Sequence, residues 1–174
     1  NPFHFRPALA PQVAAAIEGV KVSEASVLRR LKALQAGGDF LLIEGAGGLL
    51  APLGPGYSLL TLIEKLDAEV VIAASNRLGV LNHVLLTVRA LQSVSRPLAA
   101  VVLTPPEIRD ASARWNERTL RKCLPGRLVL SLPRLRGNLA SANTIRRHAG
   151  RLARPLDRII SSSARPPAMP SERA

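Results

Sequence analysis

A single carboxylate, Glu44, is followed by a segment with almost no side chains, and this pairing is the clearest chemical signal in the 174-residue sequence. Residues 39–44 form an apolar run that predicts a buried strand, and glycines occupy positions 45, 47 and 48. An ionised group left unpaired in an apolar setting costs several kcal/mol, so Glu44 is expected to face a positive charge. A lysine or arginine in a structural ion pair is one candidate for that charge, and a metal ion is the other.

The glycines beside Glu44 favour the metal ion. Residues without side chains let backbone N–H groups approach an anion closely. A carboxylate next to such a segment suits a magnesium ion, which prefers oxygen ligands. An acid for a metal beside bare amides for a phosphate predicts a nucleotide site in which Glu44 is the magnesium ligand.

Apolar runs rich in leucine or β-branched residues are predicted to form strands, and their starts are about 30 residues apart, as in βαβ units. There are four such runs, at residues 39–44, 69–75, 97–103 and 127–132. Helical patterns separate them and begin at Ser58, Leu81 and Asp110, the last of these with Asp110 as its predicted N-cap. The alternation predicts an α/β fold with three layers, in which a mainly parallel sheet carries helices on both faces.

The two ends of the sequence differ in composition. Residues 10–19 and 23–38 have the pattern of two helices, the second with Ser23 as its N-cap and two glycines as a stop signal. Residues 161–174 are rich in serine, proline and arginine and have no apolar period, which is typical of a disordered tail. We therefore expect one α/β domain in residues 1–160, followed by a basic disordered tail.

The net charge is +12, from 24 basic and 12 acidic side chains. From Arg146 onward, seven arginines oppose only two acids, and the remaining charge is spread along the chain. This distribution is typical of solvated helix faces, so nucleic acid is not favoured as a partner. Trp115 is flanked by Arg114 and Arg118, as in a stacking platform, but aromatic residues make up only 3% of the sequence, and a packing role is the preferred interpretation.

The number of cysteines and the length of the apolar runs indicate the cellular compartment of the protein. One cysteine, Cys123, excludes an internal disulfide framework and fits a reducing environment. No apolar run approaches the roughly 20 residues that span a bilayer. We therefore expect a cytoplasmic protein without a membrane partner.

In open parallel sheets, ligands bind beyond the carboxyl ends of the strands. The candidate ligand loops are therefore the segments after the four runs, at residues 44–57, 75–83, 104–110 and 133–138. Each contains glycine, proline or small polar residues, which is also true of loops in general.

The same segments carry a family resemblance. The blocks LLIEGAGGLLAPL (41–53), VVIAASNRLGVLNHVLLTVRAL (70–91), LAAVVLTPP (98–106) and LSLPRL (130–135) are similar to consecutive blocks of the dethiobiotin synthetase family. The resemblance runs in order from Asn1 to about Gly150 and implies a P-loop NTPase-like fold and a homodimer. It also implies the family's reaction, in which 7,8-diaminononanoate, CO2 and ATP give dethiobiotin with Mg²⁺.

The resemblance implies roles for individual residues. The nucleotide, its phosphates and the metal are expected at Glu44, Gly45, Ala46, Gly47, Thr104, Pro105, Pro133, Arg134 and Leu135. The substrate's carboxylate is expected across the dimer interface at a helix start formed by Leu78, Gly79, Val80 and Asn82. This second role makes physical sense, because free N–H groups at a helix N-terminus attract an anion. In the first set, Glu44 is the magnesium ligand.

Two features depart from the family pattern. Thr104 stands where the family has an asparagine that reads the adenine edge, and a hydroxyl makes one such bond rather than two opposed ones, which puts nucleotide preference in question. The loop G-x-x-x-x-G-K-[ST] does not occur in the 174 residues. In the family that loop precedes the part matching Asn1 and brings the lysines that hold phosphate and carbamate, so no catalytic residue is assigned.

The missing loop leaves two interpretations. We expect the sequence to be the C-terminal portion of such an enzyme, and the alternative is a relative that has abandoned catalysis. The isolated 174 residues are then expected to fold poorly and to lack ATPase activity, since a sheet without its first strand exposes unpaired edges. Alternative functions are a basic binding module and another amidoligase-like P-loop enzyme, such as those acting on cobyrinic acid.

Overall fold

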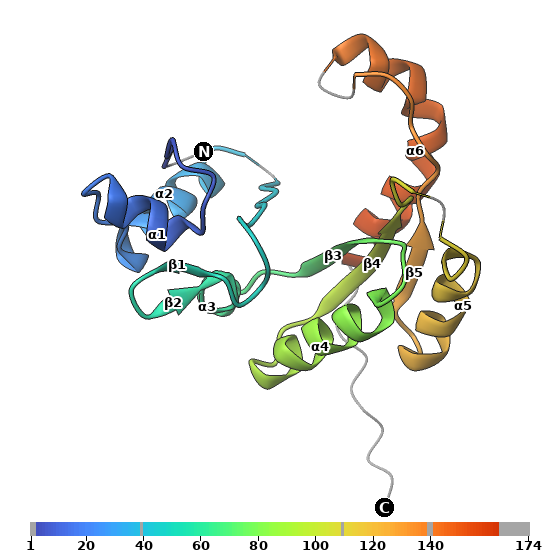
Figure 1. The fold of residues 1–174 in the computed structure, drawn as a ribbon, viewed down its shortest axis with the longest axis horizontal. Coiled ribbons are helices and arrows are strands. Elements are labelled where there is room, and N and C mark those ends of the chain that lie inside the picture. Colours follow the sequence, from blue (N-terminus) through green and yellow to red (C-terminus); the bar gives the residue numbers. More distant parts are fainter. Residues whose placement is uncertain (1–2, 39, 109, 139–140, 164–174) are drawn as a thin grey trace, which may run out of the picture. The chain divides into compact units, whose positions relative to one another are not determined.

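Figure 1 shows the computed structural model, which describes residues 3–38, 40–108, 110–138 and 141–163. The chain divides into two compact units, Asn1–Ala68 and Glu69–Ala174. Among the described residues, the first unit contains three helices and a two-stranded sheet, and the second contains a three-stranded sheet and three helices. No helix in the described ranges is long and apolar enough to cross a membrane.

The first unit consists of α1 (Pro11–Ile17), α2 (Glu24–Gln35), β1 (Pro52–Gly54), β2 (Tyr57–Ser58) and α3 (Leu59–Leu66). The two helices predicted near the start of the sequence are α1 and α2. Ser23 caps α2 as predicted, because its hydroxyl oxygen accepts the Ser26 N–H at 3.3 Å. β1 and β2 pair in antiparallel fashion. The sequence did not predict them, because strands this short show no period.

A small apolar core holds the first unit together. Its buried members are Ala15, Val22, Val27, Leu31, Tyr57 and Leu62. The Tyr57 hydroxyl donates to the backbone oxygen of Val22 at 3.2 Å, which ties β2 to the connection between α1 and α2. Burial raises the pKa of Tyr57 and the charge of Glu24 raises it further, so the phenol stays protonated at neutral pH.

Residues 40–44 were predicted as a strand and do not form one. A strand requires a neighbour that shares its backbone hydrogen bonds, and no described residue pairs with this segment. The alternation of side chains is nevertheless present, since Phe40 and Leu42 are 74% and 79% exposed while Ile43 packs against the core. The strand assignment is therefore wrong for 40–44, and Asp39 lies outside the described residues.

The second unit is built on a parallel sheet with the order β3–β4–β5, made of β3 (Val70–Ser75), β4 (Leu98–Thr104) and β5 (Leu128–Ser131). These are the other three predicted strands. Ala73 lies opposite Val102, which lies opposite Leu130, so the carboxyl ends of the strands reach the same edge. The central strand β4 buries its first six residues, which explains its continuous apolar run.

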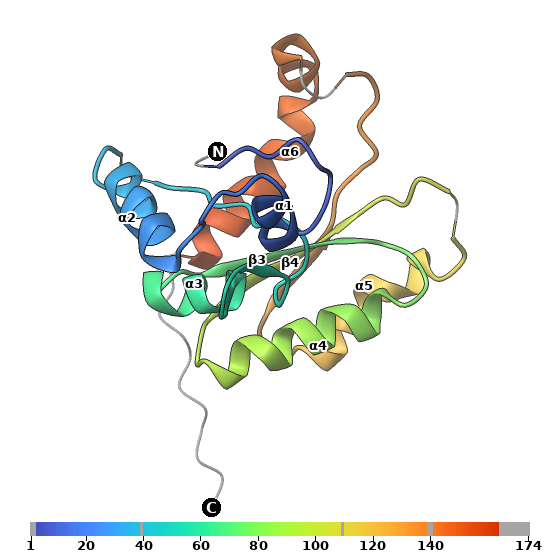
Figure 2. The same cartoon turned by 60° about the vertical axis from the view of Figure 1, so that its left-hand side comes forward.

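Helices cover both faces of this sheet, as predicted. α4 (Val80–Ser93) and α5 (Ala113–Cys123) lie on one face, and α6 (Ala142–Ser163) lies on the other (Figures 1 and 2). α4 packs through Val80, Val84, Val88 and Leu91, which lie on one face of the helix. The parallel sheet covered by helices has the architecture of a P-loop NTPase-like α/β fold.

α6 shifts the predicted end of the folded domain. The helix continues to Ser163, so residues 161–163 are helical, whereas 164–174, the rest of the predicted tail, lie outside the described residues. The sequence did not predict α6, because Gly150 and Pro155 interrupt its helical pattern.

The first turn of α5 also differs from prediction. Ser112 rather than Asp110 is the N-cap residue, and Asp110 instead accepts the Ser112 N–H at 2.8 Å. Trp115, for which a packing role was expected, is 55% exposed, and the Arg114 guanidinium lies over its ring, 5.4 Å from the centroid. Trp115 therefore contacts a cation at the surface and contributes little to the core.

Candidate functional site

Glu44 lies in the first unit, between α2 and β1, and its side chain is exposed. It makes no ion pair with another described residue. The part of the chain that the structure describes also holds no group of three acidic, histidine or cysteine side chains able to bind a metal ion. The expectation that burial forces a positive partner on Glu44 is wrong, because water solvates an exposed carboxylate. Its role as a magnesium ligand stays a prediction.

Local packing and backbone conformation explain why glycine occupies two of the three glycine positions after Glu44. A Cβ on Gly45 would lie 2.2 Å from Cδ2 of Leu59, so a side chain there would displace that leucine. Gly47 has φ +81°, in the left-handed region that favours glycine. Gly48 has open space around its Cβ position. Packing and backbone conformation thus account for Gly45 and Gly47, and only Gly48 lacks such a reason.

The start of α4 is the second predicted segment, and it lies in the second unit. After β3, the Asn76 N–H donates to the backbone oxygen of Thr104 at 2.8 Å, and the chain then turns at Gly79, whose φ is +91°. Gly79 is the N-cap residue of α4 and has no side chain with which to cap it. Within the described ranges, the N–H groups of Leu81 and Asn82 have no acceptor, so they are available to an anion.

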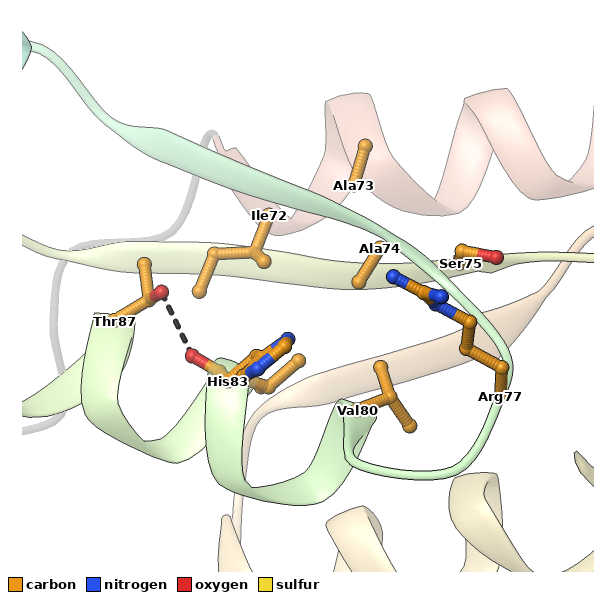
Figure 3. Close-up of a pocket in the computed structure, with 9 residues that line it drawn as sticks. Ile72, Ala73, Ala74, Ser75, Arg77, Val80, His83 and Thr87 are labelled. Atoms are coloured by element: carbon orange, nitrogen blue, oxygen red, sulfur yellow. Dashed lines mark hydrogen bonds between the residues drawn. The ribbon is translucent and has the colours of Figure 1, made fainter. Parts of the chain in front are cut away.

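A cavity of about 230 Å³ lies between β3 and α4. Its lining includes Ile72, Ala74, Arg77, Val80, His83 and Thr87. Figure 3 shows the Arg77 side chain turned back toward Ala74, while the His83 side chain projects from α4 itself. Two side chains able to carry positive charge therefore line the cavity between β3 and α4.

A buried amide pair fixes the segment that leads into α4. Asn76 and Asn116 are 8% and 3% exposed. The Asn116 side-chain amide donates to Oδ1 of Asn76 at 2.9 Å and to the backbone oxygen of Arg77 at 3.4 Å. Asp110 adds a further contact, since its Oδ2 accepts the Leu78 N–H at 2.8 Å. The sequence did not single out Asn76, Arg77 or Asn116.

The carboxylate of Asp110 is held in its charged form. Hydrogen bonds from the Ser112 hydroxyl and from the N–H groups of Leu78 and Ser112 lower its pKa, and the charge of Arg77 lowers it further. Asp110 is therefore ionised at neutral pH.

The predicted nucleotide residues of the second unit lie in two neighbouring loops. Thr104 ends β4, and its hydroxyl donates to a backbone oxygen of β3 at 3.3 Å. The Arg134 guanidinium, from the loop after β5, donates to the backbone oxygen of Pro106 and to that of Glu107 at 3.2 Å. Arg134 therefore joins the loop that begins after Thr104 to the loop at residues 133–135.

Three of the predicted ligand loops thus meet at the carboxyl edge of the sheet. Asp110 joins the loop after β4 to the start of α4, and Arg134 joins it to the loop after β5. Glu44 and the three residues after it belong to the first unit. The edge of the second unit's sheet is therefore the candidate functional site, and its free N–H groups suit an anionic ligand.

Comparison with known proteins identifies the class of this protein. Residues 1–139 match the family model described as an AAA domain, and the chain belongs to this family. It is similar in particular to ATP-dependent dethiobiotin synthetases. It is 39% identical over 138 residues to that of Rhodococcus jostii, 38% identical over 138 residues to that of Pseudomonas aeruginosa, and 31% identical over 137 residues to that of Aromatoleum aromaticum.

These three alignments cover 78% or 79% of the chain. The chain spans 60% or 61% of the length of these relatives. The resemblance to dethiobiotin synthetases that the motifs carry is confirmed, and with it the P-loop NTPase-like fold class.

Proposed function

We propose that this protein is an ATP-dependent ligase that carboxylates 7,8-diaminononanoate with CO2 and closes the ureido ring of dethiobiotin. The observation that carries the proposal is the meeting of three family-like loops at the carboxyl edge of one sheet, joined by Asp110 and Arg134. The similarity to relatives named ATP-dependent dethiobiotin synthetases supports the choice of reaction.

The proposed reaction proceeds in three steps. A substrate amine attacks CO2 and loses a proton, which gives a carbamate. A carbamate oxygen then attacks the γ-phosphate of ATP and displaces ADP, forming a mixed anhydride. The second amine attacks the carbonyl carbon of that anhydride, inorganic phosphate leaves, and the ring closes. Such chemistry asks the protein mainly to position the reactants and neutralise charge.

The start of α4 is proposed to bind the substrate's carboxylate. The N–H groups of Leu81 and Asn82 have no acceptor among the described residues, and the helix dipole favours an anion at this end. Arg77 and His83 line the adjoining cavity and add groups that can carry positive charge. The residues that the motif predicts for this subsite are Leu78, Gly79, Val80 and Asn82.

The nucleotide is proposed to bind the remaining predicted residues, which are Gly45, Ala46 and Gly47 at the phosphates and Thr104, Pro105, Pro133, Arg134 and Leu135 at the base. Arg134 contributes by holding the loop after β4 in place.

Glu44 is proposed to bind Mg²⁺. An exposed carboxylate fits this ion, because Mg²⁺ is commonly held by one or two carboxylates together with substrate phosphates and water. When bound, magnesium supplies charge neutralisation at the transferring phosphoryl group.

We also propose that the protein is a homodimer. Leu78, just before α4, and Leu86, in the middle of α4, are 80% and 60% exposed. Covering these side chains with a partner would remove apolar surface from water. A second copy of the chain is the partner that the family resemblance implies.

The substitution Glu44→Gln tests the proposal in the natural protein that carries this sequence. We expect the wild type to release ADP only when 7,8-diaminononanoate and bicarbonate are present. Glu44→Gln is expected to lower kcat about 100-fold, because a charge-stabilising group is lost. Glu64→Gln changes another exposed carboxylate of the first unit in the same way and is expected to keep the wild-type rate.

Two results would contradict different parts of the proposal, the reaction and the metal role of Glu44. A wild-type protein without diaminononanoate-dependent ADP release would reject the function. Unchanged magnesium-dependent turnover in Glu44→Gln would reject the metal role of this residue and leave the reaction standing.

A further inference from the structure

The last two residues before α4, Leu78 and Gly79, have little packing of their own. Leu78 is 80% exposed, and Gly79 adopts φ +91° with open space around its Cβ position. The chain is packed again only at Val80, which is 3% exposed. The direction of the first N–H groups of α4 therefore depends on contacts from other elements.

Those contacts come from the start of α5. Asp110 accepts the Leu78 N–H on Oδ2 at 2.8 Å, and it accepts the hydroxyl and N–H of Ser112 on Oδ1 at 2.6 and 2.8 Å. One carboxylate therefore joins the starts of two helices. The Ser112 hydroxyl oxygen also accepts the Asn116 amide at 3.2 Å, which connects Asp110 to the buried pair of Asn116 and Asn76.

We propose that Asp110 is a positioning residue for the carboxylate subsite at the start of α4, with Ser112 and Asn116 as its support. This inference rests on the function proposed for that subsite. Because Asp110 occupies the Leu78 N–H, the substrate's carboxylate binds the N–H groups of Leu81 and Asn82. Leu78 then sets the position of the subsite without donating to the substrate.

A carboxylate suits this role better than an amide does. Asp110 accepts three hydrogen bonds, and the NH₂ group of an asparagine would face at least one of these donors. The negative charge of Asp110 would by itself repel a neighbouring anion. The positive charge of Arg77 acts on Asp110 and reduces that repulsion.

The substitution Asp110→Asn tests the inference in the natural protein, with two readouts. In the ligand-free protein, hydrogen exchange at the Leu78 amide is expected to become about tenfold faster, because its acceptor is replaced. In turnover assays, KM for 7,8-diaminononanoate is expected to rise about tenfold. The KM for ATP and the Tm are expected to change little, which separates positioning from a general loss of stability.

Glu107→Gln is the matched control, because it makes the same chemical change on an exposed side chain of the same loop. Both the exchange rate at Leu78 and the KM for 7,8-diaminononanoate are expected to stay at wild-type values. Ser112→Ala gives an independent check, since it removes one of the three donors to Asp110. It is expected to move both readouts in the same direction as Asp110→Asn, by a smaller factor.

Three results are distinguishable. Faster exchange at Leu78 with an unchanged KM for diaminononanoate would show a purely structural contact and overturn the inference. Unchanged exchange would overturn it as well, because Asp110 would then not hold the segment. A wild-type protein with no diaminononanoate turnover would instead reject the proposed function, and the subsite role with it.

Discussion

At the scale of single residues, Asn116 and Asn76 are both buried and hydrogen-bonded to each other at 2.9 Å. Each amide has polar atoms that need a partner where water has little access. Removing one member leaves the polar atoms of the other without that partner, which costs more than the net value of the bond. The pair therefore contributes to stability as well as to the position of the segment before α4.

Asn116→Ala is expected to lower the free energy of unfolding by about 2 kcal/mol, because Asn76 loses its amide donor in a buried setting. Urea unfolding followed by circular dichroism measures this change. Asn143→Ala, at an exposed position of α6, is the control and is expected to change stability by less than about 0.5 kcal/mol. Equal effects of the two substitutions would show that the buried pair contributes nothing specific.

Part of the candidate site could be predicted from the residues alone. Leu78 to Asn82 form a continuous motif after an apolar run, and the free N–H groups at the start of α4 agree with the prediction of an anion site there. Asp110 and Asn116 could not be connected to that motif, because they lie 32 and 40 residues from their partners Leu78 and Asn76. Polar residues near a helix start otherwise suggest a cap or a solvated face.

At the scale of elements, the turn from β3 into α4 depends on one backbone conformation. Gly79, the residue immediately before α4, has φ +91° and turns the chain into the helix. A Cβ at this position would meet no atom within 4 Å. The cost of a side chain therefore arises from the backbone alone, since L residues rarely adopt this conformation.

Gly79→Ala is expected to lower the free energy of unfolding by about 1–2 kcal/mol, the cost of a left-handed conformation at a non-glycine residue. Gly150→Ala is the matched control, since it also lies in open space but within α6 and without a positive φ. It is expected to raise stability by up to about 1 kcal/mol through helix propensity. Chemical denaturation distinguishes these opposite signs, and a gain in stability for Gly79→Ala would contradict the account.

The elements that the sequence predicted correctly are those whose side chains carry a strong period or a long apolar run. β4 shows this clearly, because a central parallel strand is buried on both faces. Residues 40–44 alternate as a strand does but form none, because a strand also needs a neighbour to pair with. α6 is the converse case, a helix whose sequence lacks a clear helical pattern. Gly150 and Pro155 interrupt that pattern, although the helix forms and packs on the sheet.

At the scale of the whole molecule, the homodimer proposal predicts a measurable mass. Sedimentation equilibrium of the natural protein is expected to give twice the mass of one chain at micromolar concentration. Leu86→Arg places a charge on the exposed apolar surface of α4 and is expected to shift the mass toward one chain. Circular dichroism of that variant is expected to match the wild type, and a single-chain mass in the wild type would refute the dimer.

The loop between β4 and α5 is held at two places. Arg134 donates to the backbone oxygens of Pro106 and Glu107. Near the end of the loop, Asp110 accepts the Leu78 N–H. Most surface loops tolerate insertions, because only their ends are fixed. Here one residue more or fewer between Glu107 and Asp110 would move Asp110 away from Leu78 and turn the start of α4. The length of this loop therefore determines the geometry of the site, as the identities of its residues do.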